Sequence, residues 1–292
     1  MTSVPPLVGI IGGSGIYAID GLTNVRWERV LSPFGEPSDD LMFGELDGQK
    51  LVFLPRHGRG HRVPPSALNF RANIDALKRV GVTEILSISA VGSLREELAP
   101  GDFVIVDQYI DRTAGRAASF FGPGLVAHVS MADPVCTRLG THLQATLAAQ
   151  GLPYTRGGTY VAIEGPQFST RAESRLYRAW QADVVGMTNL PEARLAREAE
   201  LCYASVAMVT DYDCWHPQHD AVTVDAILRV LLGNATKAQQ LVTALAPRVA
   251  GDGHGAQCAC RRALDHALVT APAARDPQMV EKLRGIAGRV LG

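Results

Sequence analysis

The sequence predicts an α/β fold in a single domain, with a central mixed, largely parallel sheet flanked by helices. Its apolar runs are short and rich in valine and isoleucine, as in strands that are buried on both faces. Helical patterns lie between these runs, and such alternation places helices on both faces of a sheet. The chain has 292 residues, 47% of them hydrophobic, so it can bury a substantial core.

Strands are predicted where a short apolar run stops at glycine or at polar residues. The first run, for example, ends at the glycine-rich stretch 12–15. The predicted strands cover residues 7–11, 51–54, 85–91, 103–106, 159–163, 184–187 and 204–209.

Helices are predicted where apolar residues recur with a helical period. The segment 66–80 places Phe70, Ile74 and Leu77 on one face. The segments 171–180 and 192–201 also have helical patterns, and a proline just before the second one suits a first turn. The segment 224–245 is predicted to form a long amphipathic helix, with Val224, Ile227, Leu228 and Leu231 spaced along one face.

No linker, low-complexity stretch or internal repeat divides the chain. Only the glycine-rich region 251–255 resembles a hinge. We therefore expect a main domain of residues 1–250. A short C-terminal helical extension, residues 251–292, is expected to pack on the same domain.

Composition narrows the possible partners and the cellular location. The 28 basic and 29 acidic residues nearly balance, which argues against nucleic acid or an anionic membrane as the main partner. There is no apolar run long enough for a transmembrane helix, and the N-terminus lacks the pattern of a signal peptide. Five scattered cysteines do not suggest a secreted disulfide framework. We expect a cytoplasmic protein.

Candidate site residues cluster where predicted strands end. In open α/β sheets, ligands bind outside the carboxyl ends of the strands. Arg56 could hold a phosphate through two parallel hydrogen bonds, although the pair Arg56-His57 by itself favours an ordinary surface ion pair. The polar residues at strand ends are Ser14, Arg56, His57, Ser89, Thr188, Asp211 and Asp213.

The loop 12–15 has two interpretations that the residues leave equally open. It could be a tight turn, or its amides and the Ser14 hydroxyl could hold an oxyanion. Gly13, Gly15 and Ala18 also fit a dinucleotide-binding fingerprint, but this signal is weak. The fingerprint needs a helix after the loop, and Gly21 leaves little room for one.

Asp211 and Asp213 form the most suggestive pair. In a regular strand they would point to opposite faces, so both can face one ligand only if the chain turns there. They could simply form a solvated turn. The functional interpretation is purine recognition by their carboxyl groups.

The metal-binding residue types give no clear signal. No set of histidine, cysteine and aspartate has convincing spacing for a metal, although His61 follows His57 closely, so we predict none. Cys258 and Cys260 could be a redox pair or two inert thiols, and we favour thiols. His128 taken alone is more typical of a structural histidine.

Taken in order, several motifs resemble the methylthioadenosine phosphorylases of the trimeric purine nucleoside phosphorylase family. The resemblance runs from residue 8 to about residue 245. The matching motifs are VGIIGGSG (8–15), PFGEPSD (33–39), RHGRGH (56–61), SAVGSLREELAPGD (89–102), DQYIDRT (107–113), IEGPQFSTRAES (163–174), GMTNLPEARLAREAELCYAS (186–205) and VTDYDCW (209–215).

The resemblance implies a role for each candidate residue. Asp211 and Asp213 would bind the purine, with Asp211 as the catalytic acid, Thr210 beside them and Phe168 against the base. Met187 would lie against the ribose. His128 would reach the site from a neighbouring subunit. The implied phosphate ligands are Ser14, Arg56, His57, Ser89, Ala90 and Thr188, and the implied wall for the 5′-methylthio group is Val224, Ile227 and Leu228.

The implied activity is the phosphorolysis of 5′-methylthioadenosine to adenine and 5-methylthioribose 1-phosphate, in purine and methionine salvage. The resemblance implies no cofactor, with inorganic phosphate as a co-substrate, and a homotrimer or a dimer of trimers. A methylthioinosine or purine nucleoside phosphorylase is the main alternative. A dinucleotide-dependent oxidoreductase and a non-catalytic nucleoside-binding protein are more distant ones.

Two features depart from the family pattern. Cys258 and Cys260 lie in the C-terminal extension, and a similar pair forms a disulfide in some archaeal relatives. The segment 120–125 is shorter than in some relatives, which bears on how far His128 can reach.

Overall fold

The computed structural model describes residues 7–13, 16, 19–217, 224–252 and 258–292, without the side chains of residues 224–229, 231, 232 and 251. In these residues, eleven strands form one mixed sheet. The strands are β1 (Leu7–Gly12), β2 (Thr23–Glu28), β3 (Leu41–Leu46), β4 (Gln49–Pro55), β5 (Val82–Ser93), β6 (Phe103–Val106), β7 (Gln108–Arg112), β8 (Tyr154–Arg156), β9 (Thr159–Ile163), β10 (Val184–Gly186) and β11 (Cys202–Asp211).

The centre of the sheet is parallel. Strand β5 lies between β1 and β11 and runs parallel to both. At its far end β5 also pairs with β10, in the antiparallel sense. The parallel centre brings the carboxyl ends of β1, β5 and β11 to one edge, where polar side chains can meet. The predicted mixed, largely parallel sheet is confirmed.

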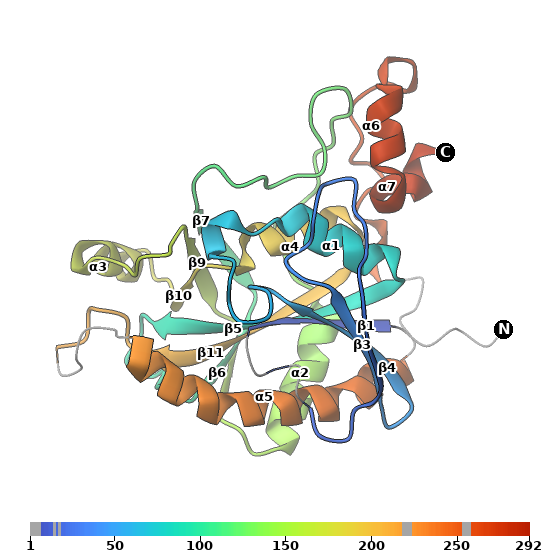
Figure 1. Ribbon diagram of the computed structural model, residues 1–292. Helices are drawn as coiled ribbons and strands as arrows, with labels where there is room; N and C mark the ends of the chain where they lie inside the picture. The colour runs from blue at the N-terminus through green and yellow to red at the C-terminus, as the bar shows by residue number, and fades with distance from the viewer. Residues whose placement is uncertain (1–6, 14–15, 17–18, 218–223, 253–257) are drawn as a thin grey trace.

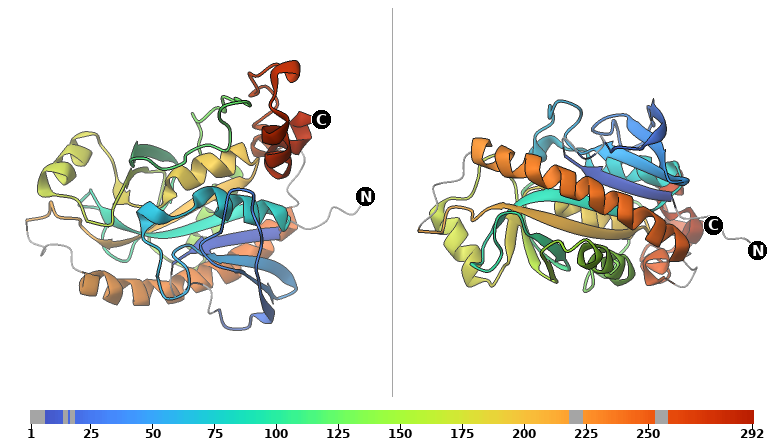
Figure 2. Two further views of the ribbon diagram at one scale, coloured as in Figure 1. Left: turned by 45° about the horizontal axis from the view of Figure 1, so that its top comes forward. Right: turned by 90° about the horizontal axis from the view of Figure 1, so that it is seen from below.

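Helices cover both faces of this sheet (Figure 1). Helices α1 and α4 pack on one face, and α2 and α5 on the other, where α5 runs along much of the sheet (Figure 2). The helices are α1 (Phe70–Arg79), α2 (Thr137–Ala149), α3 (Arg171–Ala179), α4 (Asn189–Glu198), α5 (Val224–Asp252), α6 (Pro277–Lys282) and α7 (Arg284–Leu291).

Side-chain alternation along β1 divides the core between the two faces. Ile11 packs with the α1 side of the core, and its neighbour Ile10 packs with the α2 and α5 side. Both residues are fully buried, as expected for a strand covered on both faces. This explains why the strand sequences are continuous apolar runs.

The described elements contain most of the predicted ones. Strands β6 and β9 have the predicted bounds, and the other predicted strands differ by a few residues at their ends. The predicted helix 66–80 begins only at Phe70, because Asn69 accepts a hydrogen bond from the Ala72 amide and caps the helix there. The sequence analysis missed β2, β3, β7, β8 and α2.

The C-terminal segment packs against the α1 side. Leu264, Leu283 and Ile286 belong to the same apolar cluster as α1, and α7 contacts α1. The predicted hinge at 251–255 falls mostly outside the described residues. None of the described helices is both long and apolar enough to cross a bilayer.

Candidate active site

A cavity of about 560 Å³ opens at the carboxyl ends of β1, β5 and β11. It brings together residues that are far apart in the sequence, from Gly13 to Asp213. The candidate residues that line it are Arg56, His57, Ser89, Ala90, Phe168, Met187, Thr188, Thr210, Asp211 and Asp213.

The chain turns after β11, as joint use of Asp211 and Asp213 requires. Strand β11 ends at Asp211, and Asp213 adopts a left-handed backbone conformation with φ of 50°. The Asp213 amide donates to Asp211 Oδ1 at 2.8 Å, which closes the turn. Both carboxyl groups therefore line the same cavity.

The two carboxyl groups differ in the hydrogen bonds that their oxygens accept. Thr210 Oγ1 donates to Asp211 Oδ2 at 2.7 Å, so both Asp211 oxygens accept a hydrogen bond. Asp213 Oδ2 is buried and makes no hydrogen bond among the described residues, although the hydroxyls of Ser174 and Ser169 lie close enough to lower the pKa of Asp213. Buried polar atoms without a partner are rare and costly, so they point to a ligand.

Burial raises the pKa of both carboxyl groups above the usual range of aspartate. For Asp213, the nearby Asp211 carboxylate raises the pKa further. Hydrogen bonds to Asp211 oppose the effect of burial without cancelling it. A protonated acid at this end of the cavity is thus favoured by desolvation.

Gly92 allows the two carboxyl groups to approach β5. A Cβ atom built at Gly92 would lie 2.9 Å from Asp211 Oδ1 and 3.2 Å from Asp213 Cβ. Any larger residue would push the Asp211 carboxyl group out of place. A glycine is therefore required here by close packing.

Arg56 is buried at the opposite end of the cavity. Its side chain forms a bidentate ion pair with Glu192, with Nε to Oε2 at 3.0 Å and Nη2 to Oε1 at 3.1 Å. Nη1 donates to the Ile88 carbonyl at 2.9 Å, and Nη2 also donates to Ser87 Oγ at 2.6 Å. Arg56 is 1% exposed, so the interpretation as a surface ion pair is wrong.

This network limits how Arg56 can hold an anion. A guanidinium has five N–H groups, and the parallel pair on Nε and Nη2 donates to Glu192. One Nη1 hydrogen remains for a ligand, because the other donates to Ile88. Arg56 therefore has one N–H group and its positive charge to offer an anion, and not the two parallel N–H groups of a bidentate contact.

His57 lies beside Arg56 as a neutral imidazole at physiological pH. Burial, and then the charge of Arg56, lower the pKa of His57 to about 4. Its Nδ1 lies 2.9 Å from the Val63 carbonyl, which can only accept, so Nδ1 carries the proton. The remaining nitrogen, Nε2, is then an acceptor.

Two hydroxyl groups complete this end. Ser89 and Thr188 are buried and line the cavity, Ser89 on β5 and Thr188 directly before α4. Ser89 Oγ donates to Asn189 Oδ1 at a long 3.3 Å, and Thr188 makes no side-chain cap with its helix. Both hydroxyls can therefore turn to an incoming anion at little cost.

Arg116 organises the loops that line the cavity, and the sequence analysis missed it. Its guanidinium donates to the carbonyls of Met187 and Glu164, both at 2.7 Å, and to the Glu164 carboxylate at 3.0 Å. It thereby fixes the segment after β9 to the segment after β10. No spacing pattern marks Arg116, because its partners are far away in the sequence.

Of the predicted site residues that the structure describes, His128 does not line the cavity. His128 is exposed, and its amide donates to the Ala267 carbonyl at 2.8 Å. Val224, Ile227 and Leu228 lie at the start of α5, but their side chains are outside the described part of the structure, as is Ser14. The roles expected of these residues stay predictions.

The fold and this site can be compared with known proteins. Residues 7–247 match the Phosphorylase superfamily. The chain belongs to this family. It is 60% identical to the S-methyl-5′-thioadenosine phosphorylase of Rhodospirillum rubrum, over 98% of each chain.

Solved structures agree with this membership. A methylthioadenosine phosphorylase from an Antarctic soil metagenomic library superposes with a TM-score of 0.90 at 49% identity, over 97% of this chain and 99% of that one. A variant of the Schistosoma mansoni adenosine/methylthioadenosine phosphorylase in complex with methylthioadenosine gives 0.81 at 39% identity, over 89% and 96%. The resemblance that the motifs suggested is confirmed.

Proposed function

We propose that this protein cleaves 5′-methylthioadenosine with inorganic phosphate and releases adenine and 5-methylthioribose 1-phosphate. The observation that carries the proposal is the cavity itself. One end holds a buried cation with hydroxyl groups, and the other holds two desolvated carboxyl groups. An anion and a purine can therefore lie on the two sides of one ribose.

At the purine end, Asp213 and Asp211 divide recognition and catalysis. The unpartnered Asp213 Oδ2 accepts a hydrogen bond from the 6-amino group of adenine. Protonated Asp211 donates toward N7 as the bond between C1′ and N9 breaks, which neutralises charge that develops on the base. The Phe168 ring lines the cavity and packs against the base.

At the other end, the chain holds phosphate by position and charge. Arg56 supplies a positive charge and one N–H group, and the hydroxyls of Ser89 and Thr188 donate further bonds. Neutral His57 offers Nε2 as an acceptor for the hydroxyl of monoprotonated phosphate. Phosphate oxygen then attacks C1′ on the face opposite the leaving adenine.

No cofactor takes part in this reaction, because phosphate itself is the nucleophile. Ser14 and the Ala90 backbone add further phosphate contacts, and Met187 lies under the ribose. These assignments follow the family resemblance, and Ala90 and Met187 lie on the cavity wall.

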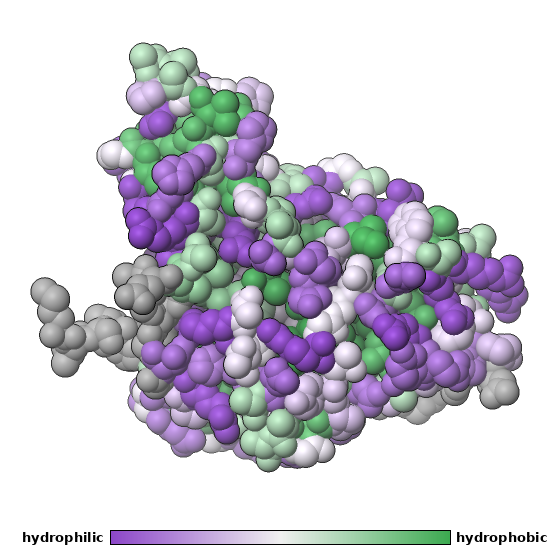
Figure 3. Space-filling view, turned by 180° about the vertical axis from the view of Figure 1, so that it is seen from behind, coloured by the Kyte–Doolittle hydropathy of each residue, from purple (hydrophilic) through white to green (hydrophobic). Residues whose placement is uncertain are grey.

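The 5′ end of the nucleoside is completed by a second subunit in this proposal. Val224, Ile227 and Leu228 form an apolar wall for the methylthio group, and the exposed His128 of a neighbour closes it. A trimer provides such a neighbour. Figure 3 shows apolar residues mixed with polar ones on the surface of the projecting part of the molecule.

We place the protein in the cytoplasm.

The test is the release of adenine from methylthioadenosine with and without phosphate, followed by chromatography. Adenine and a sugar phosphate should form only when phosphate is present. Equal release without phosphate would mean a hydrolase, and faster cleavage of inosine or methylthioinosine would mean a phosphorylase for 6-oxo purines. Binding without any turnover would mean a nucleoside-binding protein.

A further inference from the structure

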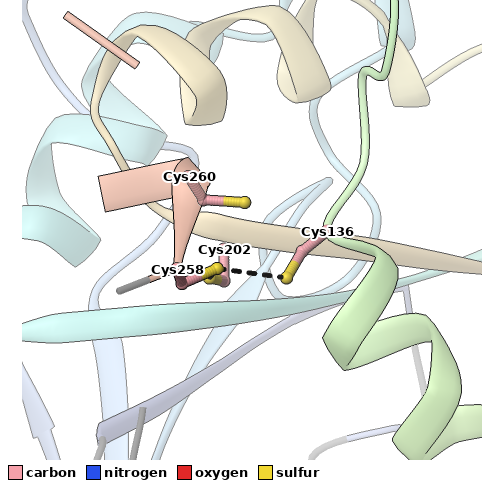
Figure 4. Close-up of side chains that lie close together, drawn as sticks. All are labelled: Cys136, Cys202, Cys258 and Cys260. Carbon is pink, nitrogen blue, oxygen red and sulfur yellow. Dashed lines mark hydrogen bonds between the residues drawn. The ribbon is translucent and has the colours of Figure 1, made fainter. Parts of the chain in front are cut away.

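Four of the five cysteines meet at one place far from the cavity. The Sγ atoms of Cys136, Cys202, Cys258 and Cys260 all lie within 4.8 Å of one another. Figure 4 shows the four side chains gathered at one place. The first two and Cys260 are buried, and Cys258 is partly exposed. None of them lines the cavity.

The cluster unites three separate segments. Cys136 is the residue before the first turn of α2, Cys202 begins β11, and the other two flank the start of a short 3-10 helix, Ala259–Arg262. Hydrogen bonds that do not involve the thiols also join these segments. The Cys136 amide donates to the Tyr203 carbonyl at 2.7 Å, and the Leu264 amide donates to the carboxylate of Glu200, just before β11, at 3.0 Å.

The sulfur separations match a metal site and not a disulfide. Cys258 Sγ lies 3.9 Å from Cys136 Sγ and 3.5 Å from Cys202 Sγ. A disulfide needs about 2.05 Å. A tetrahedron of sulfurs about 2.3 Å from a zinc ion has S···S edges of about 3.8 Å.

The surroundings suit a site that carries negative charge. Four thiolates around Zn²⁺ leave a net charge of −2, which a buried position tolerates only with cations nearby. Arg197 Nη1 lies 3.6 Å from Cys260 Sγ. Arg138 also lies close to Cys136 and Cys202, although it shares its charge with the carboxylates of Glu84 and Asp252. The position of Cys136 at the N-terminus of α2 also favours a thiolate.

We propose that Cys136, Cys202, Cys258 and Cys260 form a closed, structural tetrathiolate site for Zn²⁺. Each thiol loses its proton to solvent as it binds the ion, and no redox step is involved. The sequence analysis predicted no metal, because the spacing Cys-x-Cys supplies only two ligands and the other two lie far away in the chain.

The site would anchor the C-terminal segment. Beyond Cys260, this segment pairs with the loop that carries His128. The Val269 amide donates to the Val126 carbonyl, and the Asp276 amide to the Gly124 carbonyl, both at 2.9 Å. A bound zinc ion would therefore hold the C-terminal segment, and through it the loop 124–128, against the main sheet.

The first experiment measures the metal content of the full-length protein, purified under reducing conditions without a chelator. Elemental analysis should find one zinc ion per chain, and X-ray absorption should find four sulfur neighbours at about 2.3 Å. After removal of zinc, Co²⁺ should give the intense visible bands of tetrahedral thiolate coordination. Iron in place of zinc, disulfides in the unreduced protein without metal, or an apoprotein that binds neither ion would overturn the proposal.

Variants connect the ion to these residues. The double variant Cys258→Ser/Cys260→Ser should lose nearly all zinc, whereas Cys214→Ser, which alters the one cysteine outside the cluster, should keep it. Zinc removal from the unaltered chain should speed amide exchange at residues 124–128 and 267–269, while β1 and β5 exchange as before. Zinc retained by the double variant, or uniform exchange, would contradict the assigned site or its anchoring role.

Discussion

The phosphate end and the purine end of the cavity use buried charge in opposite ways. Four of the five N–H groups of Arg56 are used within the protein, on Glu192, Ser87 and the Ile88 carbonyl. Asp213 keeps a buried oxygen without a partner, and burial raises its pKa and that of Asp211. The charge at the phosphate end thus contributes to the stability of the fold, whereas the buried carboxyl groups at the purine end lower that stability until a ligand binds. Substitutions should therefore lower stability at the first end and activity at the second.

The largest effect is expected from Asp211→Asn. The amide cannot deliver a proton to N7, so kcat should fall by about 10² to 10⁴, the usual contribution of a general acid. The variant can keep its contacts, because Thr210 Oγ1 can turn its one hydrogen to the Val91 carbonyl, 3.1 Å away, and accept from the new amide. Steady-state kinetics with methylthioadenosine measure the loss. A fall of less than about tenfold would mean that another group protonates the base.

The pH dependence of activity and of stability, compared between the unaltered enzyme and Asp211→Asn, sharpens this test. In the unaltered enzyme, activity should be lost as the pH rises through the raised pKa of Asp211, because the acid form is then depleted. The folded state binds an extra proton between the unfolded and folded pKa values, so stability falls as pH rises through that window. Asp211→Asn should remove the dependence of activity on this acid and weaken the dependence of stability, which Asp213 partly maintains through its own raised pKa, and it should be the more stable protein at pH 7. Denaturant titrations at several pH values measure the second effect.

At the phosphate end, Arg56→Ala should act first on stability. It leaves the Glu192 carboxylate buried without its cation, at a cost of about 3–5 kcal/mol in the free energy of unfolding. The positive charge of Arg56 is itself well maintained, because the Glu192 carboxylate outweighs burial and raises its pKa. Urea titration measures the loss, and the KM for phosphate should rise in the protein that remains folded.

The matched control replaces both partners. Arg56→Met combined with Glu192→Leu removes the charges together, so it should be clearly more stable than Arg56→Ala alone. The double variant should still bind phosphate poorly. If it is as unstable as the single variant, the ion pair is not the source of the loss.

The sequence predicts the fold better than the edges of the sheet. Buried central strands such as β6 and β9 leave continuous apolar runs, and their bounds were predicted correctly. Strand β2 is exposed along its whole length, so its polar sequence gives no such signal. In α2, Leu139, Leu143 and Leu147 are buried at helical spacing, but the pattern lies within a segment that the sequence analysis did not assign.

For the site, strand-end residues could be predicted but their partners could not. Asp211 and Arg56 follow apolar runs, and the cavity lies at the carboxyl ends of those strands. Glu192 and Arg116 lie within a helix and a loop, and they matter only because the fold brings them to distant residues. The four cysteines of the zinc proposal could not be predicted as a cluster for the same reason, since no single segment holds more than two of them.

A smaller effect is expected from Asp213→Asn, which changes selectivity. An amide can donate to the 6-oxo group of inosine-type bases, whereas the carboxylate can only accept from the 6-amino group. One such hydrogen bond is worth about 1–3 kcal/mol, so the ratio of kcat/KM for methylthioadenosine over methylthioinosine should fall about 10- to 100-fold. Asp47→Asn, in the exposed turn between β3 and β4, is the control. An unchanged ratio would contradict the assignment of Asp213 to the base.

The smallest effect concerns the 5′ end, where we propose that a neighbouring chain contributes His128. His128 is exposed and does not line the cavity of its own chain, so His128→Ala should fold normally. If the side chain reaches a neighbouring site, the KM for methylthioadenosine should rise about fivefold, which corresponds to a loss of roughly 1 kcal/mol in binding free energy. Adenosine, which lacks the thioether, should change less. Equal changes for the two substrates would place His128 away from the methylthio group.

Mixed oligomers decide whether that site is shared. His128→Ala subunits keep Asp211, and Asp211→Asn subunits keep His128. In a hybrid oligomer, a site can therefore have both intact groups only if Asp211 comes from one chain and His128 from its neighbour. At low methylthioadenosine concentration, the rate per intact Asp211 should then rise above that of the His128→Ala protein alone. Mass spectrometry of the intact oligomers shows whether the subunits have exchanged. Complete exchange with no increase in rate would assign His128 to a structural role in its own chain, because a contact across the interface must be restored by a neighbour that carries it.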